Sequence, residues 1–524
     1  MSGFASLLSQ FKETTAAAAA SSSSSGGGGG GGTGSKRSRS SFEQSSSSQP
    51  HQLRQKQSKI PSSEHNNYCY PSSTPIKTIY IACPANTETG GPEALHQLCH
   101  MINSGEYYFD DDTTDKKGDD DDVHDEFGRL ITDKRSSSSS KQQLHKGKRQ
   151  LKAFMLYLRE RSSSGNKTSV EQVFGDNRSS SPRPSKYDKY NAPMMEHHFP
   201  PHHPPESTSN NGGEYSSDLV IWPEVWTHLI DSLQPLSEPA LNTTKYQSAI
   251  WWLSVNNNKG RFAPHQFIKR QDILHLVQSS YARDHVLTKL TAHSGSDANK
   301  NSEQQQQHVL TMTEFIPYTS SEFALLSTPT TTTKPTSSGK GGNGSKENLV
   351  VYNPAKGMHW TDEIIRRACG KQAKTERDGS VTTAGGIRFC PIGKGPGGRE
   401  RLTGEEVVEL LKTAKVYIDF GPHPGMDRLP REACLAGCVV ITNREGAANF
   451  DSDVPLPSEF KFAQFDVDKI CSLIKECCSK HDEYAEKLDK YKSWILAQRV
   501  QMKACVDGMV NEVVTKRIGC VKKD

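Results

Sequence analysis

The segment VYIDFGPHPGMDRLPREACLAGCVVIT, residues Val416 to Thr442, holds the pattern that decides the fold. Together with Lys415, its first residues form an apolar run, KVYIDF, that predicts a strand. LPREACLAG predicts a helix, because proline is tolerated in a first helical turn and Gly437 provides a stop. CVVIT predicts a second strand. A strand, a helix and a strand in this order predict parallel strands joined by a crossover helix.

The same alternation occurs in an earlier part of the chain. IKTIYIACP, at 76–84, predicts a strand that leads through Gly90 and Gly91 into an apolar helix pattern. Residues 224–233 also fit a helix. Further strands are predicted in this part at 153–158, 218–223, 248–255 and 273–279.

After a threonine-rich stretch the alternation starts again. Strands are predicted at 348–354 and 386–392, and Thr403 and Glu406 have the capping-box spacing of a helix start. Near-continuous apolar strands that alternate with helices indicate parallel sheets covered on both faces. We therefore expect an α/β protein with two Rossmann-like, doubly wound domains.

Composition limits how much of the chain can fold. Only 33% of the residues are hydrophobic and the mean hydropathy is -0.70. Serine, glycine, threonine and aspartate tracts bury too little surface to offset the entropy lost on ordering. The expected organisation is a disordered tail at 1–74, an N-terminal domain at 75–326 with disordered insertions near 105–150 and 162–217, a linker at 327–346, a C-terminal domain at 347–465 and C-terminal helices at 466–524.

Charge and cysteine usage exclude several classes of protein. The net charge of +4 is small and scattered, so no nucleic-acid partner is predicted, although KRSRS at 36–40 leaves a nuclear or polyanion-binding tag open. No apolar run approaches the roughly 20 residues that cross a bilayer, so we expect a soluble, cytoplasmic protein. The 12 cysteines lack paired C-x-x-C spacing and indicate reduced thiols. No cofactor or metal is predicted, and HHFPPHH at 197–203 is interpreted as a proline-rich insertion.

The loop GPHPGMDR, residues 421–428, is the candidate site. Ligands of open parallel sheets bind beyond the carboxyl ends of the strands, where KVYIDF delivers this loop. The helix that follows directs free N–H groups and its positive dipole end there, which favours an anion. Arg428 offers a guanidinium fork for a diphosphate, and Glu432, expected in the first helical turn, can accept hydrogen bonds from sugar or ribose hydroxyls. The alternative is that Asp427 caps the helix and Arg428 pairs with Glu432.

Other conspicuous side chains are interpreted as structural. Trp251 and Trp252 are expected on opposite faces of a buried strand, because side chains alternate along a strand. His96 and His275 are expected in the core or at its edge.

The segment at 416–442 also carries a resemblance to a known group of proteins. Together with VVYNPAKG, IWWLSV, HLVQSSYA and TGGPEALHQL it resembles glycosyltransferase-like proteins of bacteria and algae that are related to the retaining glycosyltransferases of family 4. Those enzymes have the GT-B architecture, in which two Rossmann-like domains face a cleft. The resemblance implies transfer from a nucleotide sugar to a carbohydrate or other hydroxyl acceptor, with retention and without a metal. It also implies a last helix that crosses back to the first domain.

The resemblance assigns roles to particular residues. It implies that Gly90 and Gly91 approach the donor phosphates and the acceptor, and that Lys356 contacts the diphosphate. Glu432 is similar to the second glutamate of an E-x7-E motif, which binds the ribose.

The sequence departs from the family pattern at two positions. Pro424 stands where the motif has its first glutamate, and Asn256 stands where aspartate is expected. We interpret His423 and Asp427 as the candidate catalytic residues in place of that glutamate. A nucleotide-sugar epimerase and a non-catalytic scaffold remain open as alternatives.

Overall fold

The computed structural model describes residues 76–105, 107–110, 148–162, 168–173, 181–195, 215–230, 245–255, 268, 273–291, 309–316, 346–370, 374–376, 379–393 and 402–515. All of them lie in one compact unit, Asn67–Asp524. The predicted tail at 1–74 and most of the predicted linker at 327–346 lie outside the described residues, as does Asn256.

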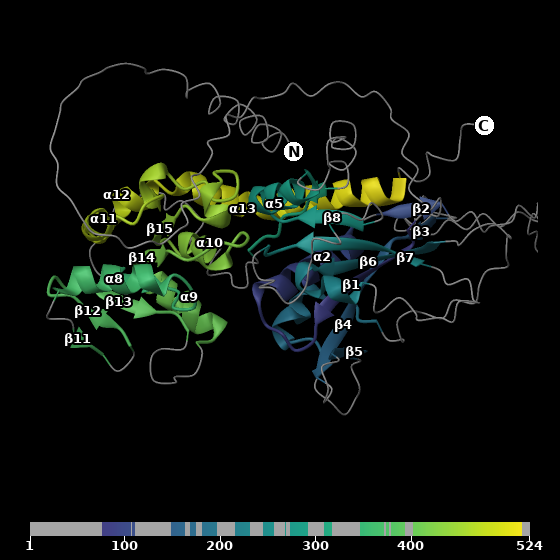
Figure 1. Cartoon of the computed structure of the whole chain (residues 1–524), viewed down its shortest axis with the longest axis horizontal. Helices are drawn as coiled ribbons and strands as arrows, with labels where there is room; N and C mark the ends of the chain where they lie inside the picture. The colour runs from purple at the N-terminus through teal and green to yellow at the C-terminus, as the bar shows by residue number, and fades with distance from the viewer. Residues whose placement is uncertain are drawn as a thin grey trace, which may run out of the picture. The chain divides into compact units, whose positions relative to one another are not determined.

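The first part of the chain forms a mostly parallel sheet (Figure 1). Its strand order among the described residues is β5-β4-β1-β6-β7-β8-β9, and only β5 runs antiparallel to its neighbour. A separate pair, β2 and β3, is antiparallel. The elements are β1 (Thr78–Pro84), α2 (Gly90–Ser104), β2 (Tyr108–Asp110), β3 (Lys148–Gln150), β4 (Lys152–Ser162), β5 (Thr168–Gln172), η1 (Ser185–Tyr190), β6 (Tyr215–Pro223), η2 (Glu224–Leu229), β7 (Lys245–Trp252), β8 (Ile273–Val277), α5 (Ser280–Thr291) and β9 (Val309–Thr311).

Alternating side chains give this sheet two apolar faces. Trp251 packs in one cluster with residues of α2, and Trp252 packs in the other with Ala282 and Val286 of α5. The prediction that the two tryptophans lie on opposite faces is therefore confirmed. His96 and His275 are buried, as predicted, and His275 Nδ1 accepts a hydrogen bond from the Trp252 indole at 3.1 Å.

The second part repeats this topology in its five described parallel strands. Its order is β11-β12-β13-β10-β14-β15-β16, with parallel pairing from β13 to β16 and an antiparallel hairpin at the edge. The elements are β10 (Glu347–Tyr352), α8 (Met358–Cys369), β11 (Lys374–Thr375), β12 (Val381–Thr382), β13 (Arg388–Pro391), α9 (Gly404–Thr413), β14 (Ala414–Asp419), α10 (Arg428–Leu435), β15 (Val439–Asn443), η4 (Gly446–Asn449), η5 (Ser458–Phe460), β16 (Lys461–Phe462), α11 (Val467–Ser479), α12 (His481–Glu486), α13 (Asp489–Val510) and η6 (Asn511–Thr515).

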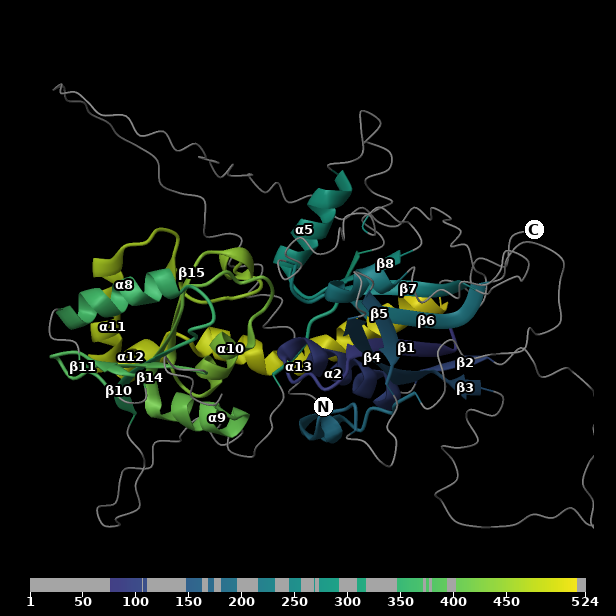
Figure 2. The ribbon, with the colours of Figure 1, turned by 60° about the horizontal axis from the view of Figure 1, so that its bottom comes forward.

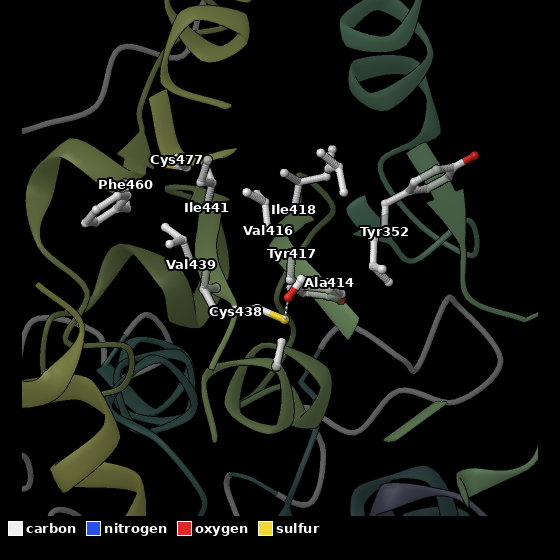
Figure 3. Packing of buried hydrophobic residues seen from close by; sticks show 14 of the residues in the cluster. Tyr352, Ala414, Val416, Tyr417, Ile418, Cys438, Val439, Ile441, Phe460 and Cys477 are labelled. Carbon is white, nitrogen blue, oxygen red and sulfur yellow. Dashed lines mark hydrogen bonds between the residues drawn. The ribbon is translucent and has the colours of Figure 1, made fainter. Parts of the chain in front are cut away.

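Helices cover both faces of the second sheet, with α8 and α9 on opposite sides (Figure 2). The predicted capping box of α9 is confirmed, because Glu406 N donates to Thr403 Oγ1 and Thr403 N donates to Glu406 Oε2. Figure 3 shows the close packing between β14 and β15, where the Cys438 thiol donates to the carbonyl oxygen of Ala414 at 3.3 Å. The two parts are thus the expected doubly wound α/β domains, arranged in series.

The last long helix joins the two hydrophobic cores. Tyr491 and Ile495, in the first half of α13, pack in the core of the second sheet. Met502, Val506 and Met509, in its second half, pack in the core of the first sheet. The crossing implied by the resemblance is therefore present, and the described part of the C-terminal region contains the helices α11, α12 and α13. None of the described helices combines the length and the apolar character of a membrane span.

Three expectations need correction. The segment predicted as a helix after β6 forms a 3-10 helix, η2, over the residues described there. The insertion predicted near 162–217 is wrong for residues 181–195, because Tyr187 and Tyr190 are buried there and the Tyr187 ring stacks on His96 at 4.3 Å. Likewise, β2 and β3 pair within the insertion predicted near 105–150. Aromatic side chains in otherwise polar sequence explain why these pieces pack.

Candidate functional site

The candidate site lies at the carboxyl ends of β10 and β14. From β10 the chain passes first to β13 on one side and then to β14 on the other, so β10 and β14 form the switch point of the second sheet. Open α/β sheets bind ligands at such a switch point. The connection after β10 carries Lys356, and the connection after β14 carries His423 and Asp427. The fold therefore brings together three residues that the sequence analysis selected from two distant segments.

The two connections pack backbone against backbone. Gly357 has a φ of +66°, and a Cβ on it would lie 2.5 Å from the backbone nitrogen of Gly421. A Cβ on Gly421 would in turn lie 2.6 Å from Cγ of Lys356. Only glycine permits this approach, and the approach delivers the Lys356 side chain to the second loop.

Lys356 supplies the positive charge at the centre of the site. Its ammonium group lies 2.5 Å from Asp427 Oδ2 and 3.3 Å from Asp419 Oδ2. Burial acts to lower the pKa of Lys356, but the two carboxylates outweigh burial and raise it. The lysine is therefore charged at neutral pH.

His423 and Asp427 form a hydrogen-bonded pair. His423 Nδ1 lies 2.7 Å from Asp427 Oδ2. Burial acts to lower the pKa of His423, but Asp419 and Asp427 outweigh it and raise this pKa. Burial acts to raise the pKa of Asp427, but His423 and Lys356 outweigh it and lower this pKa. The Asp427 side chain makes no hydrogen bond that caps α10. The alternative in which Asp427 merely caps this helix is therefore wrong.

The two members of this pair differ in access. The His423 side chain is 2% exposed, whereas the Asp427 side chain is 26% exposed. His423 Nε2 has no hydrogen-bond partner among the described residues. His423 and Asp427 both line a small cavity with Thr442 and Tyr491. The Asp427 side chain is therefore the more exposed of the two.

Arg428 connects the start of α10 to the start of α2. Its Nη1 lies 2.5 Å from Glu93 Oε2, and its Nε lies 3.6 Å from Glu432 Oε1. The Arg428 stem crosses Gly90, where an added Cβ would lie 2.8 Å from Arg428 Cδ, while Gly91 faces Leu253. The predicted alternative pair with Glu432 is thus present, but Glu93 is the closer partner.

Glu432 lies further along the helix than predicted. Because α10 begins at Arg428, Glu432 is the fifth helical residue and belongs to the second turn. Its side chain is 27% exposed, so it remains accessible beside Arg428.

Arg431 is a residue that the sequence analysis missed. It is almost completely buried, and it donates to the backbone carbonyls of Met426 and Asp427 and to the side chains of Glu314 and Gln498. These contacts hold the loop before α10 in place. No local sequence signal could have found them, because Glu314 is 117 residues away along the chain.

Further contacts tie the same loop to the first sheet. Val255 N donates to the Pro424 carbonyl at 3.1 Å, and Met426 N donates to Gln278 Oε1 at 3.0 Å. At the position where the family motif has a glutamate, this chain therefore uses a backbone carbonyl to anchor the loop.

Asp419, His423 and Asp427 have the residue types of a metal site. One ligand atom from each lies within 4.8 Å of the others. The Lys356 ammonium contacts both carboxylates of this cluster, so each already has a cationic partner.

The fold consists of two Rossmann-like, doubly wound domains, and charged side chains meet at the switch point of the second sheet. No protein-family model matches the chain. No curated protein matches its sequence.

Several solved structures have a chain path similar to that of this chain, at low sequence identity. HepE of Anabaena in complex with UDP-glucose is 10% identical with a TM-score of 0.40, and the alignment covers 83% of this chain and 99% of HepE. The N-terminal domain of trehalose-6-phosphate phosphatase of Candida albicans is 10% identical with a TM-score of 0.41, covering 87% and 99%. TarM is 10% identical with a TM-score of 0.36, covering 59% of this chain and 55% of TarM. The chain thus spans little more than half of the length of TarM.

Proposed function

We propose that this chain is a glycosyltransferase that moves a sugar from a nucleotide diphospho-sugar to a hydroxyl group of an acceptor. The observation that carries the proposal is the convergence of Lys356, Arg428 and the N-terminus of α10 at the switch point of the second sheet. Departure of the nucleotide leaves negative charge on its diphosphate, and preorganised cations at that place stabilise the transition state.

The donor would bind across the start of α10. Lys356 and Arg428 would contact the diphosphate, together with the free N–H groups of the first helical turn. Glu432, on the next turn and accessible, would accept hydrogen bonds from the ribose. Gly90 and Gly91 would allow the backbone of α2 to approach the phosphates and the acceptor, which is their role in the resembling family.

Asp427 would orient the acceptor hydroxyl, and His423 would hold Asp427. The lowered pKa of Asp427 makes it a weak base, which suits orientation better than proton removal. Retention of configuration and independence from metal ions come from the family resemblance.

The proposal is tested by calorimetry with uridine and guanosine diphosphates. Glu432→Gln keeps the size of the side chain and removes its charge, so donor affinity should fall about tenfold to hundredfold, as expected for a lost charged hydrogen bond. Arg428→Ala should weaken diphosphates similarly and the bare nucleoside much less. Glu409→Gln on α9, an exposed glutamate, is the matched control and should bind as the parent does.

The outcomes separate the alternatives. If both site variants keep the parental melting temperature and lose affinity, the site is supported; if they bind diphosphates as the parent does, the catalytic assignment should be dropped. A donor that is isomerised without an acceptor would identify an epimerase. A non-catalytic scaffold has its own support, because Lys356 and Arg428 are already paired with carboxylates, and a parent that binds no nucleotide would favour it.

A further inference from the structure

Glu93, the fourth residue of α2, holds Arg428 through one carboxylate oxygen only. Oε2 lies 2.5 Å from Arg428 Nη1. Oε1 accepts a hydrogen bond from the Tyr190 hydroxyl at 2.8 Å and lies 3.0 Å from Lys189 Nζ. The two oxygens therefore have separate sets of partners.

This division means that Arg428 can leave without stranding a buried charge. Removing the only partner of a buried carboxylate is strongly destabilising. Glu93 would instead keep Lys189 and Tyr190 on Oε1. Tyr190 is held in place, because it is buried and its segment packs on α2 through Tyr187, whose ring stacks on His96.

Glu93 is anionic at every pH at which the protein would be studied. Burial acts to raise its pKa, but Arg428, Lys189 and Tyr190 lower it to about 2. A carboxylate that is permanently charged and 2.5 Å from a guanidinium competes directly with any other anion for that guanidinium.

We propose that Glu93 is an internal competitor that occupies Arg428 until a diphosphate displaces it. Arg428 then turns from Glu93 Oε2 to the phosphate, and Glu93 remains paired with Lys189 and Tyr190. The inference rests on the proposed function, since it takes Arg428 as a phosphate ligand. It makes Glu93 a residue that sets donor affinity from the opposite domain.

The test is a double-mutant cycle read by calorimetry with inorganic pyrophosphate and with uridine diphosphate. Glu93→Gln should bind pyrophosphate about tenfold more tightly than the parent, because the competing charge is gone. In an Arg428→Ala background the same substitution should produce no gain. Glu88→Gln, at an exposed site near the same helix, should leave the affinity unchanged.

Each outcome decides the question. If Glu93→Gln still increases the affinity for pyrophosphate in the Arg428→Ala background, Glu93 acts by long-range repulsion of the anion. That result would overturn direct competition for Arg428. A parent that binds diphosphates but gains nothing from Glu93→Gln would overturn this inference and leave the proposed function intact. If only the Glu93→Gln protein binds, competition is supported in its strongest form; if none of the four proteins binds, both proposals fail.

Discussion

The two sheets share a strand order, yet the carboxylates at their corresponding switch points are held in opposite ways. Glu224 follows β6 beside β1, and its buried carboxylate accepts a hydrogen bond from the backbone N–H of Leu253 at 3.1 Å. Burial raises its pKa to about 7, against backbone hydrogen bonds that lower it. Asp427 follows β14 beside β10 and contacts Lys356 and His423, which lower its pKa despite burial.

This difference shows what topology leaves undecided. The strand order places a polar residue at each switch point, but the residues of the connecting loops decide whether its charge is stabilised. The carboxylate at the second switch point is held ionised by its cationic neighbours, whereas the pKa of the carboxylate at the first lies close to physiological pH.

The largest expected effect comes from breaking the support of the second switch point. Arg431→Met leaves Glu314 buried without its cation, so the free energy of unfolding should fall by about 3–5 kcal/mol. Urea denaturation at neutral pH measures this loss. Arg366→Met, at an exposed ion pair on α8, should leave the midpoint unchanged. A small loss in Arg431→Met would mean that Val255 and Gln278 alone suffice to hold the loop.

The second prediction concerns the pH dependence of stability that arises from Glu224 at the first switch point. The pKa of Glu224 is raised from 4.5 to about 7, so the folded state binds the proton more tightly and stability should fall as pH rises through this window. Its contribution is on the order of 3 kcal/mol. In Glu224→Gln this loss should disappear when unfolding is followed from pH 4.5 to 7.5.

His423 should leave a smaller dependence of the same sign in that variant. Because the pKa of His423 is raised in the folded state, its contribution to the free energy of unfolding is complete below the unfolded-state pKa of about 6.5. This contribution is lost as the pH rises through the folded-state pKa. An unchanged pH profile in Glu224→Gln would show that the two switch points do not differ as described.

The smallest expected effect compares two glycines of the second domain. Gly357 and Gly370 both have positive φ, at +66° and +61°, so alanine is strained at either. Only at Gly357 would the new Cβ meet backbone, whereas at Gly370 nothing lies within 4 Å. Gly357→Ala should therefore cost about 1–3 kcal/mol more than Gly370→Ala in thermal unfolding. Equal costs would show that the connection after β10 can move away from the connection after β14. The packing at Gly357 would then not be what holds Lys356 at Asp427.

Local patterns explain which parts of the fold could be predicted. The strands around IYIACP and KVYIDF, the capping box at Thr403 and the crossover helix after the candidate loop all follow from period, propensity and turn chemistry within a few residues. The packed segment at 181–195 was missed because its two buried tyrosines stand in a polar, proline-rich context.

The sequence by itself determined that the chain has two α/β domains, and that His423, Asp427, Arg428 and Glu432 follow the end of one strand. Only the tertiary structure decided their partners. Glu93 lies 335 residues from Arg428, and Glu314 lies 117 residues from Arg431. Secondary structure depends on neighbours along the chain, whereas the partner of a buried charge depends on which segments packing brings together, and that choice leaves no periodic trace in the sequence.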